Sequence, residues 1–140
     1  MVPTLSDYLT QAAAGMTRDQ FTQLIGLRAR LLDKAAAAPV GRHPRLERQA
    51  RFVCEWLGHA APLPDVLPPA WCEIAAAAWY LLKGVDQIPD SVEEIGFDDD
   101  ALILDLAFSR NRAAVEELAR HPALASFTPV SSLVPGLAQS

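Results

Sequence analysis

An acidic segment at residues 83–101 reads KGVDQIPDSVEEIGFDDDA, and its only basic residue is the lysine at its start. Carboxylate oxygens are the ligands that Mg²⁺ and Ca²⁺ prefer, and Mn²⁺ accepts them too. Such ions can also assist phosphoester hydrolysis. The residues of this candidate site are Asp86, Asp90, Asp99 and Asp100, with Pro89 and Gly96 at the bends between them. We call these six residues the acidic corner. They predict either a cation site or a purely structural corner.

Helix capping accounts for the same carboxylates without any ligand. We expect a helix to begin near Asp99 with Asp98 as its N-cap, because unpaired N–H groups and the positive end of the helix dipole favour anions there. Ser91 with Glu94 has the spacing of a capping box for a short preceding helix. Gly96 would then supply a positive φ between the two helices. Each cap would contribute about 1 kcal/mol to stability.

The crowding of like charges at this corner calls for compensation, since neighbouring carboxylates repel one another. A bound divalent cation and simple solvation are two solutions. A third is pairing with arginine, for which Arg45, Arg48 and Arg51 are candidates because they recur at intervals of three, a helical spacing. This basic stripe could dock against the acidic corner within one chain or across a dimer. A solvated face is the simpler interpretation of the stripe, and all three solutions remain open.

The acidic segment also carries a family resemblance. The residues that match are Tyr80, Asp86, Ile88, Pro89, Asp90, Gly96, Asp99 and Asp100, in the run WYLLKGVDQIPDSVEEIGFDDDALIL. This pattern resembles the core of the YkvA-like family, a bacterial domain of unknown function, over about residues 70–108. Gly84, Gln87 and Glu93 depart from it, standing where the family has proline, leucine and a second proline. The resemblance implies a helical fold and no catalytic residues. Members often look membrane-associated, but the segment is more polar here.

Other chemistry-bearing residues form no recognisable motif. Cys54, His59 and Cys72 do not have zinc-site spacing, and the two cysteines are most simply small buried hydrophobes. We find no nucleophile elbow, P-loop, HExxH or dinucleotide-binding fingerprint. Glu73 is expected in the first turn of an apolar helix, and Asp105 is expected to face solvent or an arginine. No cofactor is predicted beyond a possible divalent cation.

Composition narrows the class of protein. The chain has 140 residues, of which 51% are hydrophobic, and a formal net charge of -5. These values are typical of one folded domain, and the negative charge argues against nucleic acid as a partner. No apolar stretch approaches the roughly 20 residues of a membrane span. We therefore expect a cytoplasmic protein. Peripheral membrane attachment would need an exposed apolar patch.

The expected elements are all helical, because alanine and leucine dominate and alternating strand patterns are absent. We predict a single-domain all-α bundle over residues 1–140, with about five to seven helices and a helix-break-helix acidic corner. Its centre should be residues 70–82 and 101–108, and the proline-containing tail, 121–140, should be loosely docked. The expected helices span 5–14, 17–37 with a Thr17–Gln20 capping box, 44–58 after Pro44, 69–82 up to Gly84, 99–108 and 111–120.

These observations favour a small, non-catalytic accessory or interaction module whose partner is another protein or a second copy of itself. A cation-dependent enzyme or sensor that uses the acidic corner is the first alternative. A peripheral membrane protein is the second.

Overall fold

The computed structural model describes residues 5–37, 44–87, 93–127 and 133–134. The secondary structure of these residues is helical throughout, with turns and loops between the helices and no strand, which confirms the all-α expectation. Within them, no helix has the length and apolar character needed to cross a membrane. The elements are α1 (Leu5–Ala14), α2 (Arg18–Gly26), α3 (Arg28–Ala36), α4 (Pro44–Gly58), α5 (Pro69–Gln87), α6 (Glu93–Arg110), α7 (Arg112–Leu118) and the 3₁₀ helix η2 (Pro122–Phe127).

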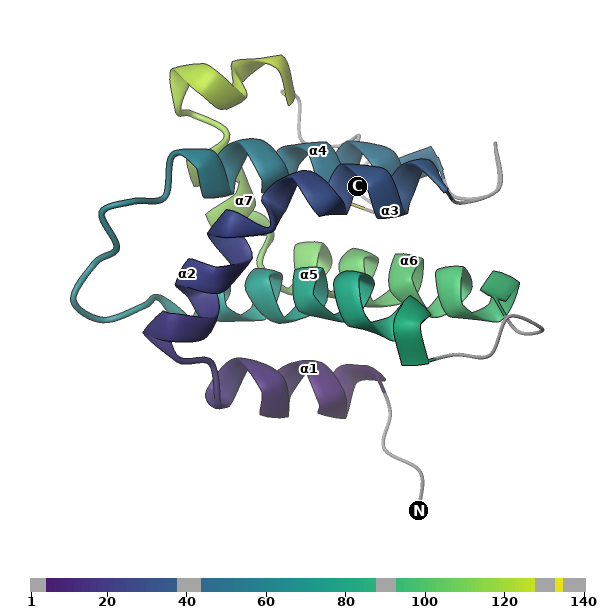
Figure 1. Ribbon diagram of the computed structural model, residues 1–140. Coiled ribbons are helices and arrows are strands. Elements are labelled where there is room, and N and C mark those ends of the chain that lie inside the picture. Colours follow the sequence, from purple (N-terminus) through teal and green to yellow (C-terminus); the bar gives the residue numbers. More distant parts are fainter. Residues whose placement is uncertain (1–4, 38–43, 88–92, 128–132, 135–140) are drawn as a thin grey trace.

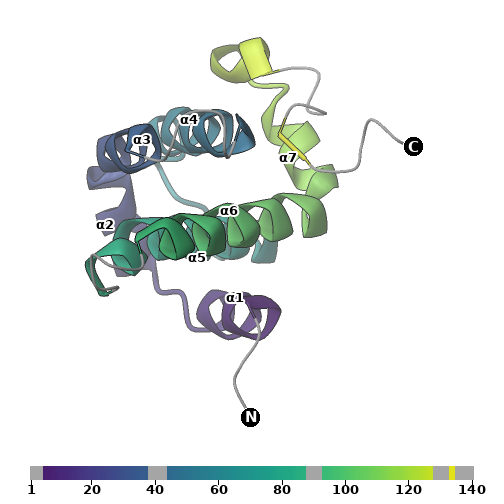
Figure 2. The same ribbon diagram turned by 90° about the vertical axis from the view of Figure 1, so that its right-hand side faces the viewer.

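The helices form three layers (Figure 1). The pair α5 and α6 lies in the middle, α1 covers one side of this pair, and α3 with α4 covers the other. The short helix α2 runs obliquely between the two outer layers. Turning the molecule shows that α7 and η2 lead from the end of α6 up to the α4 side (Figure 2). Helix η2 packs against α4.

The centre of the bundle is the contact between α5 and α6, and the central turns of α5 are rich in alanine. Ala75, Ala76, Ala77 and Ala78 are all buried, and the larger buried side chains Ile74, Leu81, Ile103, Leu104 and Phe108 surround them. Small side chains let two helices approach closely, while the larger neighbours fill the remaining space. This confirms the expected centre at residues 70–82 and 101–108.

The expected long helix from 17 to 37 is instead two helices. Its start is as predicted, because Thr17 and Gln20 form both hydrogen bonds of a capping box. The helix then breaks at Leu27, which follows Gly26 and separates α2 from α3. Glycine is a poor helix former, so a bend there costs little. The Arg28 side chain caps the exposed end by donating to the Ile25 carbonyl at 2.7 Å.

Helix α6 begins earlier than expected. It runs without interruption from Glu93, so Gly96 lies inside the helix and Asp98–Asp100 lie beyond its first turn. The predicted N-cap at Asp98 and the predicted break at Gly96 are therefore wrong. The cost of one helical glycine is about 1 kcal/mol, and the packing of α6 along α5 outweighs it. Helix α5 likewise passes Gly84 and ends at Gln87.

The tail packs more closely than the sequence indicated, as far as it is described. Leu124, Phe127, Leu133 and Val134 are all buried. The Phe127 ring meets Phe52 of α4 edge-on, with 5.4 Å between ring centroids. These apolar contacts hold η2 on the bundle, although prolines break any longer helix there.

Candidate functional site

Only part of the acidic corner belongs to the residues that the structure describes. Pro89 and Asp90 fall outside the described residues, whereas the helical backbone but no side chain is described for Asp86, Gly96, Asp99 and Asp100. A cation site there stays a prediction. The backbone bears on it in one way: Asp99 and Asp100 are successive positions of a helix, about 100° apart around its axis.

The three arginines of the basic stripe have three different environments. Arg45 pairs with Asp105 of α6, and Arg51 pairs with Glu47 one turn earlier on α4 at 3.0 Å. The Arg48 guanidinium carbon lies 5.7 Å from the centroid of the Phe127 ring, a cation–π distance. Arg45 is thus committed to Asp105, and the stripe is not a uniform docking face. The side chains of the acidic corner are not among those described, so ion pairing between them and the basic stripe stays a prediction.

Asp105 is the centre of a polar junction inside the bundle. It accepts from Arg45 Nε at 3.1 Å and Arg45 Nη2 at 3.0 Å, a bidentate pair. Gln49 Nε2, on the same face of α4, donates to Asp105 Oδ1 and to the Leu133 carbonyl, both at 2.8 Å. Of the two environments expected for Asp105, solvent or an arginine, the arginine partner is therefore confirmed. The hydrogen bond to Asp105 raises the pKa of Arg45 above its ordinary value, and the negative charge of Asp105 adds to it, while partial burial opposes both.

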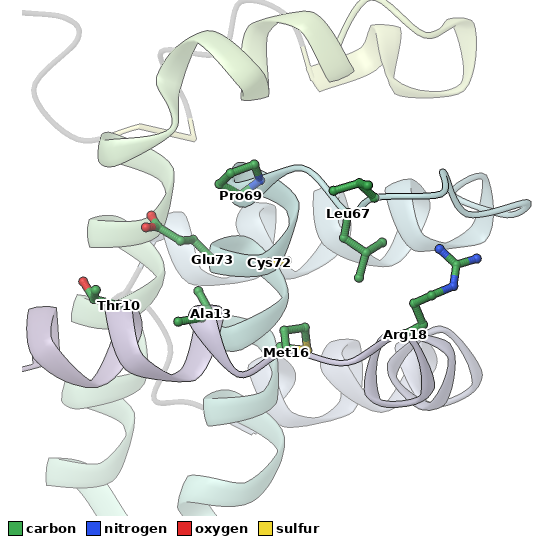
Figure 3. Close-up of a pocket in the computed structure, with 10 residues that line it drawn as sticks. Thr10, Ala13, Met16, Arg18, Leu67, Pro69, Cys72 and Glu73 are labelled. Atoms are coloured by element: carbon green, nitrogen blue, oxygen red, sulfur yellow. The ribbon is translucent and has the colours of Figure 1, made fainter.

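An apolar groove opens between the end of α1 and the start of α5 (Figure 3). Its volume is about 510 Å³. Ala13 and Met16 form one wall, Leu67 and Pro69 form the other, and Cys72 lies between them. Sequence reasoning missed this groove because residues far apart along the chain build it. The proline-rich connection between α4 and α5, residues 59–68, supplies part of one wall.

One end of the groove holds a charged network. Glu73 accepts from Arg110 Nη2 and from Asn111 Nδ2, each at 2.9 Å. Arg110 also donates to Thr10 Oγ1 at 3.0 Å, so the network ties α1, α5 and α6 together. Because α5 begins at Pro69, Glu73 lies in the second turn of the helix and not, as the sequence predicted, in the first. Its carboxylate forms an ion pair with Arg110.

Arg18 lies at the other end of the groove, beyond Leu67 (Figure 3). Its Nη1 donates to the main-chain carbonyls of Pro64 and Asp65, which fastens the proline-rich connection to α2. Among the described residues no carboxylate pairs with Arg18, and its Nε and Nη2 make no hydrogen bond.

A second, smaller cavity lies on the other side of α1. Its volume is about 290 Å³, and Tyr8, Gln11, Gln20 and Trp79 are among its lining residues. Met16 borders both cavities. This second lining is more polar than that of the groove because amide side chains replace aliphatic ones.

Neither cysteine is set up as a nucleophile. Burial raises the pKa of both Cys54 and Cys72, and the neighbouring Glu55 and Glu73, respectively, add to the effect. A raised thiol pKa lowers the fraction of reactive thiolate at neutral pH. Both side chains are free thiols.

Two histidines that are distant in sequence lie together, a contact that sequence spacing did not indicate. The ring centroids of His59 and His121 are 5.0 Å apart. His121 Nδ1 accepts from the Ala123 amide at 3.0 Å, so its lone pair is engaged in holding the start of η2. In the described part of the chain, no three His, Cys, Asp or Glu side chains gather in a way that could hold a metal ion.

Comparison with known proteins gives no relative. No protein-family model matches the chain, and no significant match is found among curated proteins or among solved structures. The resemblance to the YkvA-like family therefore stays a prediction based on residues 70–108.

Proposed function

We propose that this chain is a small, non-catalytic binding module, and that the groove between α1 and α5 receives an apolar group of its ligand or partner. The observation that carries the proposal is the groove itself. Its volume of about 510 Å³ lies within the range typical of ligand sites, which are concave, mostly apolar and preformed. Val66 at its rim is 81% exposed, more than any other large hydrophobic side chain that the structure describes.

The described charged groups near the groove support binding rather than catalysis. Glu73 is already occupied by Arg110 and Asn111, and burial raises the pKa of the Cys72 thiol. A general base or nucleophile needs a free, activated group within reach of a substrate. The groove offers shape and apolar surface instead.

The neutral dye Nile red tests this proposal, because its fluorescence rises in apolar surroundings. We expect saturable binding at one site per chain. Leu67→Asp places a carboxylate in the apolar wall and should weaken binding by about tenfold. Leu102→Asp is the matched control, since Leu102 is 57% exposed on α6 and does not line the groove. Equal weakening by both substitutions, or no saturable binding, would refute the proposal.

The compartment and the family of the module are also proposals. Two free thiols fit a reducing compartment such as the cytoplasm. Kinship with the YkvA-like family rests on the residues that match its pattern. A cation-dependent activity at the acidic corner remains the alternative, and it requires that Mg²⁺, Ca²⁺ or Mn²⁺ stabilise the folded chain by mass action.

A further inference from the structure

We propose that the occupant of the groove is a small amphiphilic carboxylate, with its apolar body on the groove walls and its carboxylate on Arg18. This inference rests on the proposed function of the groove. It goes further by naming the chemical class of the ligand and the residue that selects it.

The first support is the charge around the groove. The negative charge of Glu73 is balanced by Arg110, which lies 2.9 Å away. Arg18 has no carboxylate partner among the residues that the structure describes. Arg18 is therefore the charged lining residue that has no ion-pair partner among the described residues. A guanidinium without an ion-pair partner at the rim of an apolar groove favours an anionic ligand over a neutral or cationic one.

The second support is the geometry of Arg18. Hydrogen bonds from Nη1 to the carbonyls of Pro64 and Asp65 fix the guanidinium at the rim of the groove. This leaves the N–H groups of Nε and Nη2, which form one edge of the guanidinium fork, without a partner among the described residues. That edge is the one that binds a carboxylate through two parallel hydrogen bonds. Because these hydrogen bonds restrict the exposed Arg18 side chain before a ligand arrives, binding loses less conformational entropy.

The third support is the position of the apolar surface relative to this cation. Leu67 lies beside Arg18, and the walls continue past Met16 and Ala13 towards Thr10 (Figure 3). A ligand with a charged head at Arg18 can therefore lay a flexible aliphatic body along the groove. Met16 helps, because its unbranched thioether adapts to different shapes. A cavity of about 510 Å³ accommodates a small molecule rather than a partner helix.

The test compares octanoate with octanol, which share an aliphatic chain and differ in the charge of the head group. Each displaces Nile red from the full-length protein in a competition titration. We expect octanoate to bind about fivefold more tightly than octanol, the preference of a partly exposed ion pair. Arg18→Gln should abolish this preference, so that this variant binds octanoate no more tightly than octanol. Arg18→Lys keeps the charge but not the fork, and should retain part of it.

The affinity for octanol monitors the groove itself in every variant, so a loss of fold in Arg18→Gln is recognisable. Arg112→Gln is the charge-matched control, because Arg112 pairs with Glu116 on its own helix and does not line the groove. Equal affinities of the wild type for the two compounds would overturn the carboxylate inference and leave the binding module standing. A preference that survives in Arg18→Gln would also overturn it. Failure of both compounds and of Nile red to bind would refute the proposed function as well.

Discussion

Replacement of Phe52 by alanine is expected to lower the free energy of unfolding by about 4 kcal/mol. Phe52 is fully buried on α4. Its ring meets Phe108 of α6 and Phe127 of η2 edge-on, with centroids 5.7 Å and 5.4 Å away. Truncation would remove the transfer energy of the ring and leave a cavity at the junction of three elements. Among the described side chains, no other one makes aromatic contacts that join α4 to both α6 and η2.

Urea denaturation monitored by circular dichroism measures this loss. Phe52→Leu is the control, since it keeps most of the volume and should cost only about 1 kcal/mol. If alanine costs no more than leucine, the contact between α4, α6 and η2 is not part of the stable core.

Replacement of Asp105 by alanine is expected to lower the free energy of unfolding by about 2 kcal/mol. The Arg45–Asp105 pair supplies only part of this, because the two side chains are 43% and 21% exposed and solvent screens them. The larger part comes from Gln49, which is 0% exposed and would lose one of the two acceptors of its Nε2 group. A buried donor with an unmet hydrogen bond is costly.

The matched control for Asp105 is Glu116→Ala. Glu116 also pairs with an arginine, but both partners are about half exposed, and the loss should stay within about 0.5 kcal/mol. A combined Arg45→Ala and Asp105→Ala variant should lose less than the sum of the two single losses, because they share one interaction. An Asp105→Ala variant as stable as Glu116→Ala would show that the junction does not hold α4 to α6.

Local signals in the sequence were sufficient for much of the fold. Helix starts at Thr17, Pro44 and Pro69 could be predicted, because capping boxes and first-turn prolines act within a few residues. The break at Leu27 and the uninterrupted passage through Gly96 could not. In both places a glycine contributes only about 1 kcal/mol, and packing against distant helices decides whether the chain bends.

The candidate site was harder to predict for the same reason. Asp105 interrupts an apolar helix, and this signal correctly allowed for an arginine partner. The partnership of Gln49 with Leu133 joins segments far apart along the chain, and no spacing rule gives such a pair. The groove combines the end of α1 with the connection before α5, so its existence depends on how these elements dock. Arg18 and the ion-paired Glu73 come from separate segments, and only the fold brings them to the two ends of one groove.

The measurement that tests the central claim most directly follows the methyl group of Met16. The chain has only two methionines, Met1 and Met16, so carbon-13 labelling of their methyl groups gives a spectrum with two signals. On titration with octanol, the account predicts a saturable shift of the Met16 signal, because Met16 lines the groove. The Trp79 indole signal, which reports on the smaller cavity, should stay in place. Leu67→Asp should suppress the Met16 shift. A stationary Met16 signal at octanol concentrations that displace Nile red would place binding elsewhere and contradict the account.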